Sequence, residues 1–291
     1  MGAFQAIRRS YDGSMLVSTT ELADHLNDPN WVIFDCRHDL TDASKGPAAY
    51  AAAHIQGAFR AGVDADLSGE KTGHNGRHPL PEPEAFAAFL ARHGVAEKSR
   101  VVAYDDVGGQ YAARLWWMAR WIGFAGAAVL DGGWGKWTAE GRAVDQQVPP
   151  QTAGHVEVRL DGALLVSTAE VVRNLATGKK VVVDARAPER YRGEVEPLDR
   201  VAGHIPGALN RVFKLNLHDD LTLQSPQELK AAFSELLGSR RADEVVHQCG
   251  SGITACVNLL AMERAGLKGS KLYAGSWSEW SSDPARSVAT G

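Results

Sequence analysis

The sequence predicts an α/β protein built from two copies of one domain, each a mainly parallel β-sheet flanked by helices on both faces. Three observations support this fold class. Four sequence blocks of the first half return in the same order in the second half, apolar β-branched runs alternate with helical patterns, and several of those runs lead directly into glycine-containing turns. Strands that alternate with helices favour a parallel sheet covered on both sides.

The internal repeat divides the chain into domains. The matching blocks are residues 17–22 and 166–171, 32–37 and 181–186, 54–58 and 204–208, and 132–134 and 275–277. Four blocks in one order indicate a tandem duplication. We therefore assign residues 1–145 to an N-terminal domain, 146–162 to a linker that contains Pro149-Pro150, and 163–291 to a C-terminal domain.

Each copy is expected to contain the same elements in the same order. Ser18 and Ser167 suit the N-caps of short amphipathic helices. The apolar runs 31–34 and 180–183 lead into Asp-x-Arg and are typical of buried strands. After them the sequence predicts helices at 83–93 and 226–237, strands at 100–104 and 244–248, helices at 110–122 and 252–265, strands at 127–130 and 270–273, and a last Trp-containing helix in each copy.

The composition excludes several classes of partner. A net charge of -4 at pH 7 over 291 residues predicts neither a nucleic-acid nor an anionic-membrane partner. No apolar run approaches the roughly 18 residues that a membrane-spanning helix needs. Arg8-Arg9 is similar to part of a twin-arginine export signal, but no apolar region follows it, so we expect a cytoplasmic protein, with a short mitochondrial presequence as the alternative.

The chemistry is expected at Cys249, which directly follows the predicted strand 244–248. In an open α/β sheet, ligands bind beyond the carboxyl ends of the strands. The two glycines of the following loop let successive N–H groups converge on one point, and the next helix adds the positive end of its dipole. Both effects favour a nucleophilic thiolate, and they would hold a persulfide anion in the same way. This cradle consists of Gly250, Ser251, Gly252, Ile253 and Thr254.

The remaining cysteines and the first copy serve as internal comparisons. Three cysteines are too few and too scattered for a disulfide framework or a zinc site, so no metal is expected. Cys36 and Cys256 are expected to pack as small apolar side chains. Alignment of the two copies places Asp105 at the position of Cys249. Because an aspartate cannot accept a sulfane sulfur, the N-terminal copy is expected to lack the nucleophile.

The duplication, the two His-Ile-x-Gly-Ala motifs, Gly132-Gly133-Trp134 and the Cys249 loop together resemble the tandem rhodanese family over nearly the whole chain. The loop residues 249–255 look like those of mercaptopyruvate sulfurtransferases, whereas thiosulfate-using members usually carry Arg and Lys after the cysteine. A basic loop suits dianionic thiosulfate, and a neutral Gly-Ser loop suits a monoanionic keto acid.

The resemblance implies a sulfurtransferase without metal or organic cofactor. A sulfane sulfur would pass from mercaptopyruvate to a Cys249 persulfide and then to a thiophilic acceptor, such as cyanide, a small thiol or a thioredoxin-like protein.

The resemblance also implies two arginines that bind the donor. Arg190 matches a substrate-binding arginine of the family, and a guanidinium is the natural partner of a carboxylate. A second family arginine normally follows a Glu-Pro pair, but here Glu196-Pro197 precedes Leu198, which leaves Arg200 as the candidate replacement. Arg186 has a counterpart in Arg37, so an ion pair that holds the fold is expected for it.

Three polar residues match a proton-handling set of the family. Ser251 resembles a loop serine that relays a proton together with an N-terminal-domain aspartate, for which Asp66 is favoured over Asp64. The alternative for Ser251 is a cap on the following helix. His78 matches a histidine near the substrate and could donate to the keto oxygen.

Alternative functions are a thiosulfate:cyanide sulfurtransferase and a protein-to-protein sulfur-relay or binding module without turnover. A phosphatase of the same fold is not favoured, because Ala255 stands where such enzymes carry the arginine that clamps phosphate.

Overall fold

The computed structural model describes residues 14–291, so Arg8-Arg9 lies outside the described residues. Contacts between Cα atoms divide the chain into two compact units. Unit 1 contains the chain up to Leu67, Pro81–Asp161 and Asp220–Thr222, and unit 2 contains Ser68–Leu80, Gly162–Asp219 and Leu223–Gly291. Each unit is described by itself below.

Three segments differ in their placement from the domain boundaries of the sequence analysis. Ser68–Leu80 belongs by sequence to the first copy but packs with unit 2, and Asp220–Thr222 packs with unit 1. The stretch that was expected to be a linker packs with unit 1 as far as Asp161, because its backbone bonds to one helix of that unit and to the end of another. The N–H of Gly154 donates to the carbonyl of Ala91 at 2.8 Å, and the N–H of Arg159 to that of Ile122 at 2.8 Å.

Unit 1 contains a five-stranded parallel sheet in the order β1-β6-β5-β2-β4. Its strands are β1 (Leu16–Val17), β2 (Trp31–Asp35), β4 (Phe59–Arg60), β5 (Arg100–Tyr104) and β6 (Ala127–Leu130). A separate antiparallel pair joins β3 (His54–Ile55) to β7 (Val144–Asp145). The central strands β5 and β6 are buried throughout, as expected for a sheet with both faces covered.

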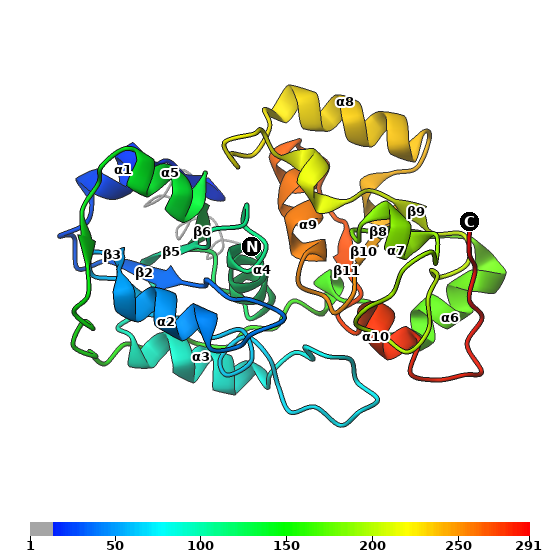
Figure 1. Ribbon diagram of the computed structural model, residues 1–291, viewed down its shortest axis with the longest axis horizontal. Coiled ribbons are helices and arrows are strands. Elements are labelled where there is room, and N and C mark those ends of the chain that lie inside the picture. The colour runs from blue at the N-terminus through cyan, green and yellow to red at the C-terminus, as the bar shows by residue number, and fades with distance from the viewer. Residues whose placement is uncertain (1–13) are drawn as a thin grey trace, which may run out of the picture. The chain divides into compact units, whose positions relative to one another are not determined.

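Helices cover both faces of this sheet (Figure 1). The helices α1 and α5 lie on one side, where Leu22 and Trp137 join a core cluster with side chains from the strands, and α2 and α3 lie on the other. Ser18 caps α1 as predicted, because its hydroxyl accepts from the N–H of Glu21. The helices are α1 (Thr19–Asp24), α2 (Lys45–Ala52), α3 (Pro83–Arg92), α4 (Ala112–Trp121) and α5 (Gly133–Ala139).

Unit 2 repeats this plan with a four-stranded parallel sheet in the order β11-β10-β8-β9. Its strands are β8 (Val181–Asp184), β9 (Leu209–Asn210), β10 (Val245–Gln248) and β11 (Lys271–Leu272). A parallel bridge between Leu165 and Leu272 stands where β1 pairs with β6 in unit 1. The two sheets confirm the predicted fold class and the equivalence of the copies.

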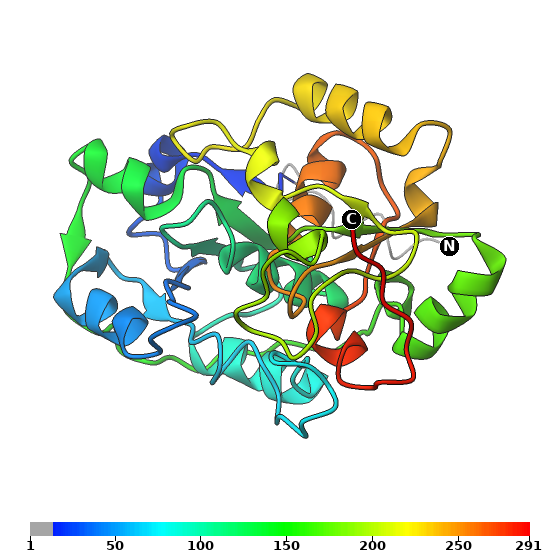
Figure 2. The same ribbon diagram turned by 45° about the vertical axis from the view of Figure 1, so that its right-hand side comes forward.

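The helices of unit 2 also cover both faces (Figures 1 and 2). The helices α8 and α9 lie on one side, and α6 and α10 lie on the other, where Trp277 and Trp280 are buried in a core cluster with β8 and β10. Ser167 and Ser225 form capping boxes with Glu170 and Glu228. The helices are α6 (Thr168–Thr177), α7 (Pro188–Tyr191), α8 (Pro226–Leu237), α9 (Ala255–Arg264) and α10 (Ser276–Trp280), with 3-10 turns η2 (Gly162–Leu164), η3 (Phe213–Asn216) and η4 (Ala242–Glu244).

None of the helices within residues 14–291 has an apolar stretch long enough to cross a membrane.

Candidate active site

Cys249 lies at the carboxyl end of β10, where a parallel sheet presents its ligand-binding loops. The residue is buried, with 2% of its surface exposed. The loop is fastened to the start of α10 by three backbone groups. The N–H of Cys249 donates to Oγ of Ser276 at 3.1 Å, its carbonyl accepts from the N–H of Trp277 at 3.0 Å, and the carbonyl of Gly250 accepts from the N–H of Ser278 at 2.9 Å.

Ser276 holds this junction in a left-handed backbone conformation with φ of 55°, which is uncommon for a residue with a side chain. Its hydroxyl donates to the carbonyl of Tyr273 at 2.9 Å while it accepts from Cys249. The equivalent residue of unit 1 is Gly133, which has the same φ of 55°. A serine therefore occupies a position where the first copy has a glycine, and its hydroxyl accepts from the backbone N–H of Cys249.

The glycines of the loop allow close contacts that a side chain would prevent. Gly252 has φ of 78°, and a Cβ there would lie 2.3 Å from the carbonyl oxygen of Ala274. Gly250 faces two guanidinium groups, because a Cβ there would lie 2.8 Å from Nη2 of Arg77 and 3.6 Å from both terminal nitrogens of Arg190. The loop therefore packs tightly against the turn that follows β11 and, at Gly250, against the guanidinium groups of Arg77 and Arg190. The helix α9 begins directly after it, so its positive dipole end favours negative charge at the loop.

Ser251 contacts His78 across a large sequence separation. Nδ1 of His78 lies 2.7 Å from Oγ of Ser251, and both side chains are buried. The alternative role as a helix cap is not seen, because α9 follows Thr254 as its N-cap residue. The pair forms because the segment Ser68–Leu80, which carries His78, packs with unit 2.

A chain of alternating charges surrounds the same loop. Arg186 binds Asp184 through two nitrogens and reaches Glu196 at 3.2 Å. Glu196 in turn accepts from Arg190 at 2.6 Å, and Arg190 contacts Oδ2 of Asp199 at 3.3 Å. Arg77 forms an ion pair with Oδ1 of the same Asp199. Three arginines are thus matched by three carboxylates.

The pKa values of two of these carboxyl groups, Asp199 and Glu196, are shifted in opposite directions. Burial raises the pKa of Asp199 above its ordinary value, although Arg77 and Arg190 act against the rise. Burial also tends to raise the pKa of Glu196, but hydrogen bonds from Arg190 and the N–H of Leu198 outweigh it and bring that pKa below its ordinary value.

Arg186 has the structural role that the sequence analysis expected. It lies 4.7 Å from the ring of Trp277 and donates to the carbonyl of Gly203 at 2.7 Å. Its counterpart Arg37 binds Asp35 and lies 4.1 Å from the ring of Trp134. The same arrangement in both copies, one of which lacks the cysteine, shows that it holds the fold.

Arg200 and Asp66 are two further residues of the predicted site. Arg200 is exposed, and its side chain makes no hydrogen bond or ion pair within residues 14–291. Asp66 belongs to unit 1, where its carboxylate accepts from the N–H of Gly62 at 2.7 Å and burial raises its pKa. Asp64, which was the less favoured aspartate, lies 3.8 Å from His38.

The equivalent loop of unit 1 is closed by a carboxylate. Asp105 follows β5 and is fully buried, with its two oxygens accepting from four backbone N–H groups at 2.7 to 3.0 Å, those of Val107, Gly109, Tyr111 and Ala112. Its carbonyl accepts from the N–H of Trp134, as that of Cys249 does from Trp277. The loop geometry of this fold therefore gathers N–H groups around a negative charge, and in the first copy the protein's own side chain supplies it.

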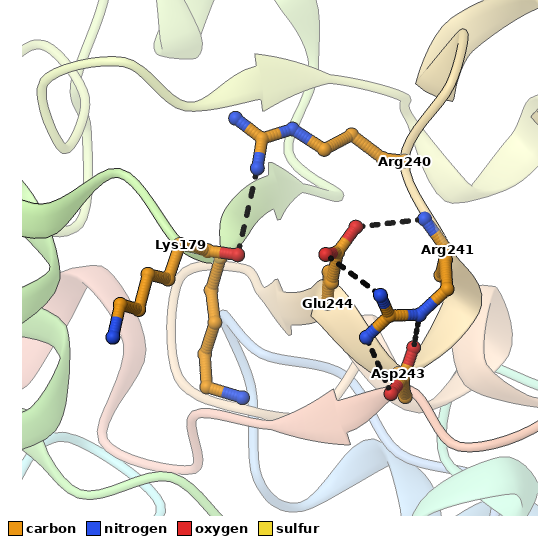
Figure 3. Close-up of a pocket in the computed structure, with 6 residues that line it drawn as sticks. Lys179, Arg240, Arg241, Asp243 and Glu244 are labelled. Atoms are coloured by element: carbon orange, nitrogen blue, oxygen red, sulfur yellow. Dashed lines mark hydrogen bonds and ion pairs between the residues drawn. The ribbon is translucent and has the colours of Figure 1, made fainter.

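The other cysteines and a surface pocket lie outside the set of charged and polar side chains described above, although the thiol of Cys256 donates to the carbonyl of Gly252 at 3.4 Å. Cys36 and Cys256 are buried, as expected of packing residues. A pocket lined by Lys179, Lys180, Arg240, Arg241, Asp243 and Glu244 lies next to the amino ends of β8 and β10, opposite the end that carries Cys249 (Figure 3). Within the described residues, no group of three or more His, Cys, Asp or Glu side chains is arranged to hold a metal.

Sequence reasoning missed three residues of the site, namely Arg77, Asp199 and Ser276. The only available signals were the position of Arg77 next to His78 and the replacement of a glycine by Ser276 in the repeat. Together the site combines a buried cysteine, a serine–histidine pair and two partly accessible guanidinium groups. This set can bind a small carboxylate, attack an electrophilic sulfur and deliver a proton.

Comparison with known proteins adds three findings. The family model of the rhodanese-like domain matches residues 18–140 and 167–283. A probable 3-mercaptopyruvate sulfurtransferase of Pseudomonas aeruginosa is 44% identical over 280 residues, which cover 96% of this chain and 99% of that protein. A putative thiosulfate sulfurtransferase of Mycobacterium tuberculosis is 39% identical over 96% of this chain and 98% of that protein.

A solved structure is similar over nearly the same range. The 3-mercaptopyruvate sulfurtransferase from Leishmania major matches with a TM-score of 0.82 at 31% identity, over 94% of this chain and 75% of that one.

Proposed function

Because this chain belongs to the rhodanese family, with two copies of the rhodanese-like domain, we propose that it is a sulfurtransferase that takes a sulfane sulfur from mercaptopyruvate onto Cys249 and passes it to a thiophilic acceptor. The observation that carries the proposal is the loop itself. Cys249, Gly250 and Ser251 lie at the end of the sheet where the fold binds ligands, and His78 contacts Ser251 while the guanidinium of Arg190 faces Gly250.

In the first half-reaction the Cys249 thiolate attacks the sulfur of mercaptopyruvate. An S–S bond forms, the bond between that sulfur and the methylene carbon breaks, and its electron pair leaves as the enolate of pyruvate, which takes up a proton at oxygen and tautomerises to pyruvate. In the second half-reaction the acceptor attacks the outer sulfur, the S–S bond breaks, and the thiolate of Cys249 returns. Each cycle transfers one sulfur atom and needs no external oxidant.

Arg190 is proposed to bind the donor carboxylate. Its side chain is 17% exposed and its terminal nitrogens face Gly250, the residue next to the nucleophile. A guanidinium has five N–H donors, so Glu196 and Asp199 leave some of them available to a bound anion.

Ser251 and His78 are proposed to handle the proton that the leaving enolate requires. The hydroxyl of Ser251 lies two residues from Cys249 and can donate to the keto oxygen while His78 re-supplies its proton. Asp66 stays the proposed third member of this set, and its raised pKa would suit a group that exchanges protons.

Charge balance supports the keto acid as donor. The arginines 77, 186 and 190 are matched by Asp184, Glu196 and Asp199, so the site offers directed N–H groups rather than a surplus of positive charge. The loop adds no cation, because Gly250 and Ser251 follow the cysteine. Such a site suits a monoanion better than dianionic thiosulfate.

The test is steady-state sulfur transfer to cyanide with mercaptopyruvate and with thiosulfate, for the wild type and for Cys249→Ser. We expect a higher kcat/KM with mercaptopyruvate and complete loss in the variant. A preference for thiosulfate, the donor in the name of the Mycobacterium relative, would overturn the donor assignment but keep the nucleophile. Activity with neither donor would favour a protein-to-protein sulfur relay.

The physiological acceptor is proposed to be a small thiol or a thioredoxin-like protein. Turnover with mercaptopyruvate and a reduced thioredoxin in place of cyanide tests this. We also propose a cytoplasmic location. Cell fractionation, with an antibody to the protein for detection, would check it.

A further inference from the structure

Arg77 reaches the nucleophile loop from an unexpected part of the chain. It lies on Ser68–Leu80, which belongs to the first copy by sequence but packs with unit 2. The segment is fixed there at two points beside the loop. The N–H of Arg77 donates to Oγ of Ser278 at 3.0 Å, and the neighbouring His78 contacts Ser251 at 2.7 Å.

The guanidinium of Arg77 lies on the same side of the loop as that of Arg190. Both face Gly250, at 2.8 Å and 3.6 Å from the position that a Cβ would take. Their side chains are 28% and 17% exposed, whereas Arg186, which holds the fold, is 1% exposed. Two of the three arginines near the loop therefore present N–H groups that a small molecule can reach.

Asp199 fixes the spacing of these two cations. Its Oδ1 pairs with Arg77 and its Oδ2 with Arg190, so one carboxylate holds both guanidinium groups in place. Each ion pair leaves further N–H donors of the fork unused. Two adjacent forks can bind both the carboxylate and the neighbouring carbonyl of an α-keto acid.

We propose that Arg77 is the second donor-binding arginine of this enzyme, acting beside Arg190 and positioned by Asp199. The inference rests on the proposed function. It also explains how the site tolerates Leu198 after Glu196-Pro197, because the cation comes from another segment. Arg200, the replacement expected from the sequence, is exposed and does not take part in this network.

The experiment compares the two half-reactions of Arg77→Gln and Arg77→Lys. With Arg77→Gln we expect KM for mercaptopyruvate to rise about 10- to 100-fold, the range for losing a charge-assisted hydrogen bond, while transfer from preloaded enzyme to cyanide keeps its rate. Arg77→Lys keeps the charge but not the fork, so it should recover only part of the loss. The matched control is Arg192→Gln, which removes an exposed arginine paired with Glu194 and should change neither half-reaction.

Three results would overturn the role of Arg77. They are an unchanged KM in Arg77→Gln, full rescue by lysine together with slowed transfer to cyanide, and a larger KM effect from Arg200→Gln. If the wild type uses only thiosulfate, the donor assignment fails separately, and a rise in KM for thiosulfate in Arg77→Gln would still support Arg77 as the donor-binding residue. Cys249→Ser, which should abolish transfer from every donor, identifies a failure of the proposed chemistry itself.

Discussion

The backbone N–H of Cys249 donates to Oγ of Ser276 at 3.1 Å, and Ser276 is one of two residues other than glycine with positive φ within residues 14–291. Such backbone strain costs about 1 to 3 kcal/mol and often occurs at functional sites. The serine here keeps the backbone of Cys249 attached to the turn before α10. The strain and the contact to Cys249 therefore occur in the same residue.

Replacing Ser276 separates the strain from the contact. Ser276→Gly relieves the strain but loses the hydrogen bond, so we expect nearly unchanged stability and a kcat lowered about tenfold, as for the loss of roughly one hydrogen bond. Ser276→Ala loses the bond and keeps the strain, so it should be less stable than the glycine variant by about 1 kcal/mol. Urea unfolding and steady-state kinetics measure both, and full activity of Ser276→Gly would contradict this role.

The Ser251–His78 pair should behave as one unit in catalysis. Ser251→Ala and His78→Asn are each expected to lower kcat with mercaptopyruvate about 100-fold, the lower range for a proton-transferring group, with little change in KM. The double variant should be no slower than either single one, since the second substitution removes nothing further. Losses that multiply in the double variant would show that the two residues act independently.

Gly252 can be compared with a glycine that has the same φ. Both Gly252 and Gly207 have φ of 78°, but a Cβ at Gly207 meets no atom of residues 14–291 within 4 Å, whereas one at Gly252 lies 2.3 Å from the carbonyl oxygen of Ala274. Gly207→Ala should cost about 1 kcal/mol and leave activity intact. Gly252→Ala should cost about 3 kcal/mol or more and abolish sulfur transfer. Equal effects of the two substitutions on stability and activity would refute the proposed tight packing of the loop.

Asp105 is expected to stabilise unit 1 without taking part in the chemistry. Asp105→Ala leaves four buried N–H groups without their acceptor, which should lower the free energy of unfolding by about 3 to 5 kcal/mol. The folded fraction should still load sulfur on Cys249 at the wild-type rate. Denaturant unfolding and a loading assay below the transition measure the two effects, and loss of loading in folded protein would contradict the prediction.

His247 gives the protein an acid-sensitive core. Burial, with a smaller effect of Arg211, lowers the pKa of His247 to about 3, so the folded state keeps it neutral while the unfolded chain binds a proton below about pH 6.5. Stability should therefore fall as the pH falls, by about 2 kcal/mol between pH 6.5 and pH 5. His247→Leu should show a correspondingly shallower dependence in urea unfolding, and an unchanged slope would contradict the assignment.

Sequence patterns were sufficient for features that depend on local order. The strands β5 and β10 are short apolar runs that end in a polar residue and a glycine turn, so the repeat alone aligned Asp105 with Cys249. The expected ion pair of Arg186 followed from its counterpart Arg37, and both are seen.

Features that depend on tertiary placement could not be predicted from the sequence. The segment 68–80 has no periodic pattern, so nothing in the sequence indicated that it packs with the second copy and brings Arg77 to Asp199. Arg200 was chosen because it follows Glu196-Pro197 closely, but nearness in sequence does not fix the direction of a side chain on an irregular loop. The φ of Ser276 is likewise set by its contacts with Cys249 and Tyr273.

The most direct test of the central claim is the intact mass of the protein after brief exposure to mercaptopyruvate without an acceptor. We expect that the wild type and Cys256→Ala each gain one sulfur atom, that peptide mapping places it on Cys249, and that cyanide removes it. Cys249→Ser should gain none. Sulfur bound to Cys249→Ser, or a wild type that releases pyruvate without gaining mass, would contradict sulfur transfer through a Cys249 persulfide.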